Sequence, residues 1–282
     1  MKTIWIVGSS GHMGSALLEL IDCKRYEIIT TDRDEVDIAN EEQVDTYMRI
    51  NRPDVIINCA GLSDRETCEK NVDEAYRINA VGVRNLAQSA EGIQAKLIQI
   101  STDDVFSDMS DRPYNEFDKV SPDSIYGKSK LAGEDMLSKF MTRYVIIRSS
   151  WLYGTGHDFL DEVVANVGKV KSMKVSRNVY AVPTSTAELA KVVTQFIDGD
   201  HFGLYHAVCT GEACSRFDYA KEVLRAIGKE DELELIPIDD EAVSKPAYSA
   251  LDNMMLRITG LEEPGDWKET LKEYLKRTGG IR

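Results

Sequence analysis

Short apolar runs alternate with longer amphipathic segments through the first half of the 282-residue chain. The apolar runs are rich in Val and Ile and almost uninterrupted, which is typical of parallel strands covered on both faces. They predict strands at 3–8, 26–32, 54–61, 96–102 and 144–150. The intervening segments predict helices near 12–22, 41–50, 72–90 and 122–140. This alternation predicts an α/β fold with a Rossmann-type, doubly wound parallel sheet.

The pattern becomes looser after residue 151. A helix is predicted to begin near Thr184 or Ser185, and residues 203–208 predict one more strand. Further helices are predicted near 215–227 and 266–277. We therefore expect a smaller C-terminal lobe over the strand ends, where open α/β sheets bind their ligands.

Composition narrows the range of partners and of cellular locations. The net charge of −14, spread along the chain, argues against nucleic acids and anionic membrane surfaces as partners. No apolar stretch is long enough to cross a bilayer, and the first apolar run, about five residues long, is too short for a signal peptide. The five cysteines are irregularly spaced and form no C-x-x-C motif, so a disulfide framework or zinc site is not expected. These features predict a cytoplasmic protein.

A glycine-rich loop follows the first predicted strand. Its G-x-x-G-x-x-G spacing places Gly8, Gly11 and Gly14 between that strand and the next helix. Glycines there allow a tight turn and a close approach of the backbone to a pyrophosphate, which the helix N-terminus favours. Asp32 ends the second strand and suits the ribose of NAD, whereas the following Arg33 suits the 2′-phosphate of NADP. The sequence leaves the choice between NAD and NADP open.

A phenol and an ammonium share one face of a predicted helix. Tyr126 and Lys130 lie four positions apart in the segment SPDSIYGKSKLAGE. We expect the ammonium to lower the pKa of the phenol and so to make it a faster proton donor. Thr102 ends the fourth strand, where its hydroxyl is placed to orient a carbonyl. Together the three residues predict a proton-delivery site for hydride transfer.

These motifs suggest a division of the chain into two domains. Residues 1–151 are predicted to form an NAD(P)-binding domain, to which residues 178–208 return. Residues 152–177 and 209–282 are predicted to form the substrate-binding lobe.

Several motifs occur in the order found in one enzyme superfamily. The glycine loop, NCAG, INAVGVRNLA, ISTDDVF and Y-x-x-x-K together resemble an extended short-chain dehydrogenase/reductase. In the second half, RSSWLYG, VPTSTAELA, GLYHAV and KPAYSALDN resemble the dTDP-4-dehydrorhamnose reductases. The resemblance implies an NAD(P)H-dependent reductase of a 4-keto-6-deoxy sugar nucleotide, with dTDP-4-dehydrorhamnose as the expected substrate. It also suggests a homodimer.

The resemblance assigns roles to individual residues. Tyr126 is the expected proton donor, Lys130 the ribose ligand and Thr102 the carbonyl ligand. The expected cofactor contacts are Gly8, Gly11, His12, Met13, Gly14, Asp32, Asp37, Ile38, Ala60, Gly61, Tyr126 and Lys130. The expected substrate contacts are Ser63, Thr102, Asp104 and Trp151. Asn79 is expected to be structural.

The chain departs from this family pattern mainly where the family contacts the sugar. Asp104 replaces a tyrosine, and the segment LSDRET keeps a hydroxyl at Ser63 but lacks the family's lysine. Ala16 replaces a glutamate proposed to contact magnesium, so no metal is predicted. This contrast leaves the identity of the sugar nucleotide open, and dTDP-4-dehydrorhamnose stays the expected substrate.

Two alternatives remain open at this point. The first alternative is a nucleotide-sugar dehydratase or epimerase, because Asp103 and Asp104 imitate the acidic pair of the dehydratases, although we interpret Asp104 as a solvated loop residue. The chain also resembles the methionine adenosyltransferase beta subunit, a non-catalytic regulatory protein that binds NADP.

Overall fold

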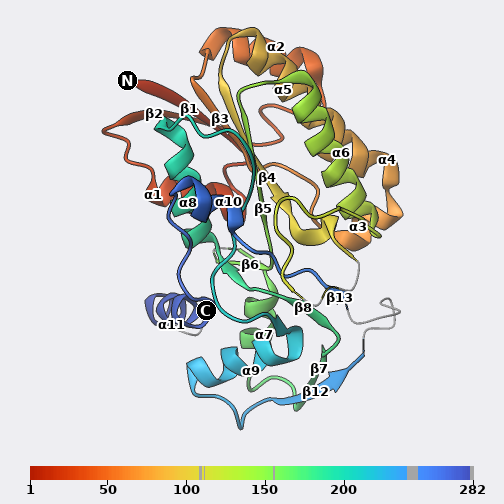
Figure 1. Ribbon diagram of the computed structural model, residues 1–282. Coiled ribbons are helices and arrows are strands. Elements are labelled where there is room, and N and C mark those ends of the chain that lie inside the picture. Colours follow the sequence, from red (N-terminus) through yellow and green to blue (C-terminus); the bar gives the residue numbers. More distant parts are fainter. Residues whose placement is uncertain (108–109, 111, 155, 240–246, 280–282) are drawn as a thin grey trace.

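Six parallel strands form the large sheet of the computed structural model, which describes residues 1–107, 110, 112–154, 156–239 and 247–279 (Figure 1). The strands are β1 (Lys2–Val7), β2 (Tyr26–Thr31), β3 (Val55–Asn58), β4 (Lys96–Thr102), β5 (Tyr144–Ser149) and β10 (Gly203–His206). They lie in the order β2-β1-β3-β4-β5-β10, so the direction of winding reverses between β1 and β3. Ligands of open α/β sheets bind at such a switch point.

Helices cover both faces of the large sheet (Figure 1). One face carries α2 (Glu41–Asn51), α5 (Val83–Gly92) and α6 (Ile125–Phe140), and the other carries α1 (His12–Leu20), α8 (Thr186–Asp198) and α10 (Met254–Thr259). Met48, Leu86 and Leu137 belong to the core on the first face. Leu17 and Phe196 belong to the core on the second face. Burial on both faces explains why the strand sequences are almost continuously apolar.

The predicted strands and the first two predicted helices are confirmed, but the predicted helix at 72–90 is wrong in detail. The segment forms α4 (Val72–Tyr76), a π-helical segment η1 (Arg77–Gly82) and then α5. An additional short helix, α3 (Arg65–Lys70), precedes it, and the Asp64 side chain caps this helix by accepting from the Thr67 amide at 2.8 Å. The predicted helix at 122–140 begins later, at Ile125, because Ser124 is its N-cap.

A smaller lobe lies beyond the carboxyl ends of the large sheet (Figure 1). Its helices are α7 (Phe159–Asn166), α9 (Arg216–Ile227) and α11 (Trp267–Arg277). Its strands are β7 (Ser172–Ser176), paired with β12 (Glu234–Ile238), and β8 (Val179–Ala181), paired with β11 (Cys214–Ser215) and β13 (Ala247–Tyr248). A third apolar core, which includes Val163, Tyr219 and Leu271, holds this lobe together.

Two short strands, β6 (Leu152–Tyr153) and β9 (Thr184–Ser185), pair where the chain passes between the two parts. Within the segment 178–208, α8 and β10 lie on the large sheet, whereas β8 hydrogen-bonds with strands of the smaller lobe. The domain boundaries themselves stay a prediction.

Candidate functional site

The glycine loop lies at the switch point of the large sheet. Gly8 has φ +78°, and a Cβ atom there would lie 2.8 Å from the Ala60 nitrogen that follows β3. A Cβ atom on Gly14 would lie 2.3 Å from the Gly8 carbonyl oxygen. Gly11 is the N-cap of α1. Side chains at Gly8 and Gly14 would collide with the backbone, so the tight turn requires glycines at both positions. A loop of this kind before a helix N-terminus fits the pyrophosphate of a dinucleotide.

Asp32 follows β2 and lies against the glycine loop. Its carboxylate accepts hydrogen bonds from the Ser9 hydroxyl at 3.0 Å and from the Ser10 amide at 3.2 Å. Asp32 therefore fixes the loop as well as standing where a ribose is expected. Its contact with a ribose stays a prediction.

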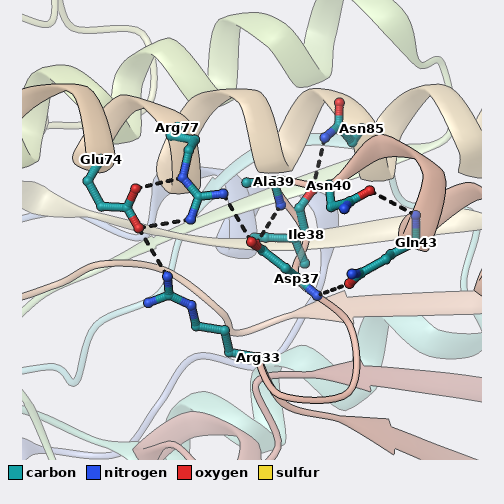
Figure 2. A network of polar contacts seen from close by, with 9 residues as sticks. All are labelled: Arg33, Asp37, Ile38, Ala39, Asn40, Gln43, Glu74, Arg77 and Asn85. Carbon is teal, nitrogen blue, oxygen red and sulfur yellow. Dashed lines mark hydrogen bonds and ion pairs between the residues drawn. The ribbon is translucent and has the colours of Figure 1, made fainter.

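Asp37 and Ile38 are held by neighbouring helices (Figure 2). The Asp37 carboxylate accepts from Arg77 Nη1 and from the Ala39 amide, both at 3.0 Å. Burial alone would raise the pKa of Asp37, but these hydrogen bonds hold it below its ordinary value. The Ile38 side chain is buried, and its carbonyl accepts from Asn85 at 2.9 Å.

The other expected cofactor residues have different surroundings. His12 Nε2 accepts from the His157 amide at 3.0 Å, whereas the Met13 side chain belongs to the core. The Ala60 amide donates to Asn58 Oδ1 at 3.1 Å. A Cβ atom on Gly61 would lie 3.8 Å from Lys130 Nζ, and one on Gly8 would lie 2.8 Å from the Ala60 nitrogen, so the segment after β3 lies between the glycine loop and α6.

Thr102, Tyr126 and Lys130 converge at the carboxyl end of β4. Thr102 is the last residue of β4; its hydroxyl accepts from the Asp104 amide at 3.2 Å and lies close enough to the Tyr126 phenol to lower the pKa of that phenol. Lys130 Nζ donates to the Ile100 carbonyl at 2.7 Å. Burial lowers the pKa of Lys130 to about 8, although the Glu134 carboxylate acts in the opposite direction. The geometry therefore brings a hydroxyl, a phenol and an amine to one end of one strand.

The pKa of Tyr126 differs from the expectation. Burial raises it above its ordinary value, the Asp104 charge raises it further, and the Thr102 hydroxyl lowers it. The predicted lowering by Lys130 is wrong here, since that ammonium binds the Ile100 carbonyl. The phenol is thus protonated at neutral pH and is chemically an acid.

The acidic pair after β4 is not solvated. Asp104 is bound by Arg65, whose Nε lies 2.9 Å from Asp104 Oδ2, and its side chain is only 12% exposed. The expectation of a solvated loop residue is therefore wrong. Asp103 is buried and accepts a 2.5 Å hydrogen bond from Ser249. Burial, followed by the Asp104 charge, raises the pKa of Asp103 to about 7.

Trp151 lies where the chain enters the smaller lobe. Its φ is +41°, and the Arg216 guanidinium lies 3.8 Å from the centre of its ring. Burial lowers the pKa of Arg216 to about 10. Ser63, the other expected sugar contact, is exposed in the loop before α3.

Sequence reasoning missed Arg65, Arg216 and Ser249. Arg65 lies in LSDRET and Ser249 in KPAYSALDN, so both stood in segments already noted. Arg216 begins α9 and carried no motif. Asn79 has the structural role that was expected, because it exchanges two hydrogen bonds with the Leu62 backbone and donates to Ser129.

A glycine loop at the switch point and a Y-x-x-x-K helix beside β4 define a short-chain dehydrogenase/reductase. A family model described as the RmlD substrate binding domain matches residues 1–279. The chain belongs to the RmlD substrate binding domain family.

Three similar proteins agree with this assignment. The dTDP-4-dehydrorhamnose reductase of Mycolicibacterium smegmatis is 31% identical over 99% of this chain and 86% of that protein. A crystal structure of such a reductase from Clostridium acetobutylicum is 38% identical, with a TM-score of 0.93 over 98% of this chain and 99% of that one. The Bacillus anthracis enzyme, crystallised in complex with NADP, is 33% identical, with a TM-score of 0.93 over 99% and 100% of the two chains.

The described residues contain neither a metal-binding cluster nor a membrane-spanning helix. No group of three or more His, Cys, Asp or Glu side chains is placed to hold a metal ion. No helix in the same part of the chain combines the length and apolar character needed to span a membrane.

Proposed function

We propose that this protein reduces a 4-keto-6-deoxy sugar nucleotide with NADPH or NADH, and that dTDP-4-dehydrorhamnose, reduced to dTDP-L-rhamnose, is the substrate. The observation that carries the proposal is the convergence of Thr102, Tyr126 and Lys130 beside the switch point of the sheet. The reductases named above support the choice of substrate class.

Each of the three residues has a task in this reaction. The reduced nicotinamide, when bound, supplies the hydride to C4 of the sugar. Tyr126, which is protonated at neutral pH, donates its phenolic proton to the C4 oxygen as the general acid. Thr102 donates a hydrogen bond to the same oxygen, and Lys130 holds the ribose hydroxyls.

The remaining assignments follow from this scheme. The cofactor lies on Gly8, Gly11, His12, Met13, Gly14, Asp32, Asp37, Ile38, Ala60 and Gly61. The sugar nucleotide lies between the two parts of the chain, against Ser63, Asp104 and Trp151. Arg216, stacked on Trp151, adds positive charge suited to a diphosphate. Residues 1–151, with α8 and β10 of the segment 178–208, bind the cofactor, and residues 152–177 with 209–282 bind the substrate. Two copies of the chain form a homodimer in the cytoplasm.

The test is NADPH and NADH oxidation with a panel of 4-keto sugar nucleotides, comparing the wild type with Tyr126→Phe. The variant is expected to lower kcat by roughly 100-fold, because general acid catalysis contributes about two to four decades. Its Kd for NADPH should stay within about threefold of the wild-type value, because the phenolic proton mainly serves the chemical step. Tyr144→Phe, at the amino end of β5, is the matched control and should keep full activity.

Two results would contradict the proposal. One is wild-type turnover in Tyr126→Phe. The other is a lack of oxidation with every 4-keto sugar nucleotide, which, together with a stoichiometric protein partner, would indicate the regulatory role instead.

A further inference from the structure

Four charged side chains of alternating sign are joined one to the next by ion pairs near the carboxyl end of β2 (Figure 2). Arg33 Nη2 lies 3.2 Å from Glu74 Oε1. Glu74 also accepts two hydrogen bonds from Arg77, at 2.6 and 2.8 Å. Arg77 in turn donates to Asp37 at 3.0 Å. One glutamate on α4 therefore forms ion pairs with two guanidinium groups.

Arg33, the first of these four residues, lies at the expected adenosine site. Arg33 comes directly after Asp32, which the glycine loop holds through Ser9 and Ser10. In this position an acidic residue suits the ribose 2′-hydroxyl of NAD, and a nearby arginine suits the 2′-phosphate of NADP. The Arg33 side chain is 69% exposed, so its guanidinium is accessible to a bound ligand.

We propose that Glu74 sets the preference between NADP(H) and NAD(H) through its ion pair with Arg33. This inference rests on the proposed function, because it takes the glycine loop and Asp32 to bind a dinucleotide. Hydrogen bonds from Arg77 hold the pKa of Glu74 below its ordinary value, so Glu74 is an anion at neutral pH. A 2′-phosphate on Arg33 has to share the guanidinium with this carboxylate. The like charges repel, and NADP(H) binds less tightly than Arg33 alone would allow.

Three other acidic side chains nearby have other partners or are exposed to solvent. Asp37 pairs with the inner guanidinium, Arg77, and Glu35 accepts from the Asp32 amide at 2.9 Å. Asp73 is exposed on α4, next to Glu74 in sequence. Glu74 is thus the carboxylate that forms an ion pair with Arg33, whereas Asp32 stands at the expected ribose. The ribose 2′-hydroxyl of NAD carries no charge and does not feel this repulsion.

Calorimetric titration with NADP⁺ and with NAD⁺, in the absence of a sugar nucleotide, tests the inference. Glu74→Gln is expected to lower the Kd for NADP⁺ by roughly three- to tenfold, the size of a surface-charge effect, and to change the Kd for NAD⁺ by less than about twofold. Arg33→Gln is expected to raise the Kd for NADP⁺ by about tenfold, because a charge-assisted hydrogen bond is lost, with little effect on NAD⁺.

The double variant and a matched control make the test specific. In the Arg33→Gln background, Glu74→Gln should leave the Kd for NADP⁺ unchanged, since the effect acts through the pair. Asp73→Asn removes the same charge one residue away and should change neither Kd.

An unchanged preference in Glu74→Gln, an equal gain in Asp73→Asn, or the same gain without Arg33 would overturn the inference. An equal increase of both Kd values in Arg33→Gln would also overturn it. Because Arg33 is an exposed side chain, this variant is expected to fold normally. Because no turnover is measured, a failure of the proposed reaction would not affect these results.

Discussion

Glu134 is a buried charged residue on α6, one helical turn after Lys130. It forms a buried ion pair with Arg148 at 2.6 Å, and it accepts from the Ser101 hydroxyl at 2.6 Å. The two charged side chains are only 6% and 4% exposed. Its negative charge also raises the pKa of Lys130, against the effect of burial. This carboxylate therefore joins α6, β4 and β5 behind the proposed active site.

Removal of the Glu134 charge should make the folded protein much less stable. Glu134→Gln leaves Arg148 buried without its counter-ion, and we expect the free energy of unfolding to fall by about 3–5 kcal/mol. Urea denaturation measures this change. The double replacement Glu134→Leu with Arg148→Met should recover much of the loss, because both buried charges are then removed. A loss below about 1 kcal/mol in the single variant would show that the pair is unimportant.

Asp103 should make stability depend on pH. Its pKa is raised from 3.8 to about 7, so between these values the folded state binds more protons than the unfolded chain. Its contribution to stability therefore falls as the pH rises from about 4 to about 7. Asp103→Asn cannot ionise, and its stability relative to the wild type should increase by at least about 1 kcal/mol between pH 5 and pH 8.

The measurement for Asp103 is urea denaturation of both proteins at the two pH values. Ser249→Ala serves as a control that removes the hydrogen bond to Asp103 but keeps the ionisable carboxyl. Equal pH dependence in wild type and Asp103→Asn would contradict the raised pKa.

Some residues of the proposed site could be predicted from the sequence around them, and others could not. Tyr126 and Lys130 were predictable because four residues make one helical turn, and Thr102 because it ends an apolar strand. Arg216 and Ser249 were not, since each meets the site only after the chain has returned over more than 60 residues. The Tyr126 pKa was misjudged because sequence spacing says nothing about burial.

At the scale of elements, α6 packs unusually closely on the π-helical segment η1. A Cβ atom on Gly133 would lie 2.2 Å from the Asn79 carbonyl oxygen. This contact sets how near α6, which carries Tyr126 and Lys130, comes to the rest of the site. The loop before α3 depends on it as well, because Asn79 holds the Leu62 backbone.

Gly133→Ala should therefore be destabilising, although alanine is the better helix former. We expect a loss of about 1–3 kcal/mol, the usual cost of overpacking, measured by thermal or urea denaturation. Gly92→Ala, at the end of α5, is the control, because its new methyl group would have no atom within 4 Å. If both variants were equally stable, the close packing of α6 would not be a constraint.

The large sheet was predictable and its connections were less so. Runs such as Ile4–Val7 and Leu97–Ile100 are buried from both sides, which leaves a continuous apolar signal in the sequence. The segment from Val72 to Gly92 is amphipathic throughout, and nothing in that pattern marks where the backbone changes to a π-helix. The short helix α3 was missed because six residues carry little periodicity.

At the scale of the molecule, two parts with separate cores meet at the carboxyl ends of the strands. Direct hydrogen bonds cross the boundary, such as that from Ser249 to Asp103 and those between Asn253 and Val208. The order of elements along the chain predicted the architecture of a sheet with an appended lobe. It did not predict that β8 would leave the sheet, because three residues are too short for a reliable pattern.

The strand order also has a consequence for synthesis. The last strand, β10, and the helix α8 lie more than 30 residues beyond the other five strands in the sequence. While a ribosome has released only the first half, Leu17 and its apolar neighbours still lack the cover that Val193 and Phe196 later provide. The nascent polypeptide thus exposes an apolar surface at least until α8 has been synthesised, and that interval is when molecular chaperones would have most to protect.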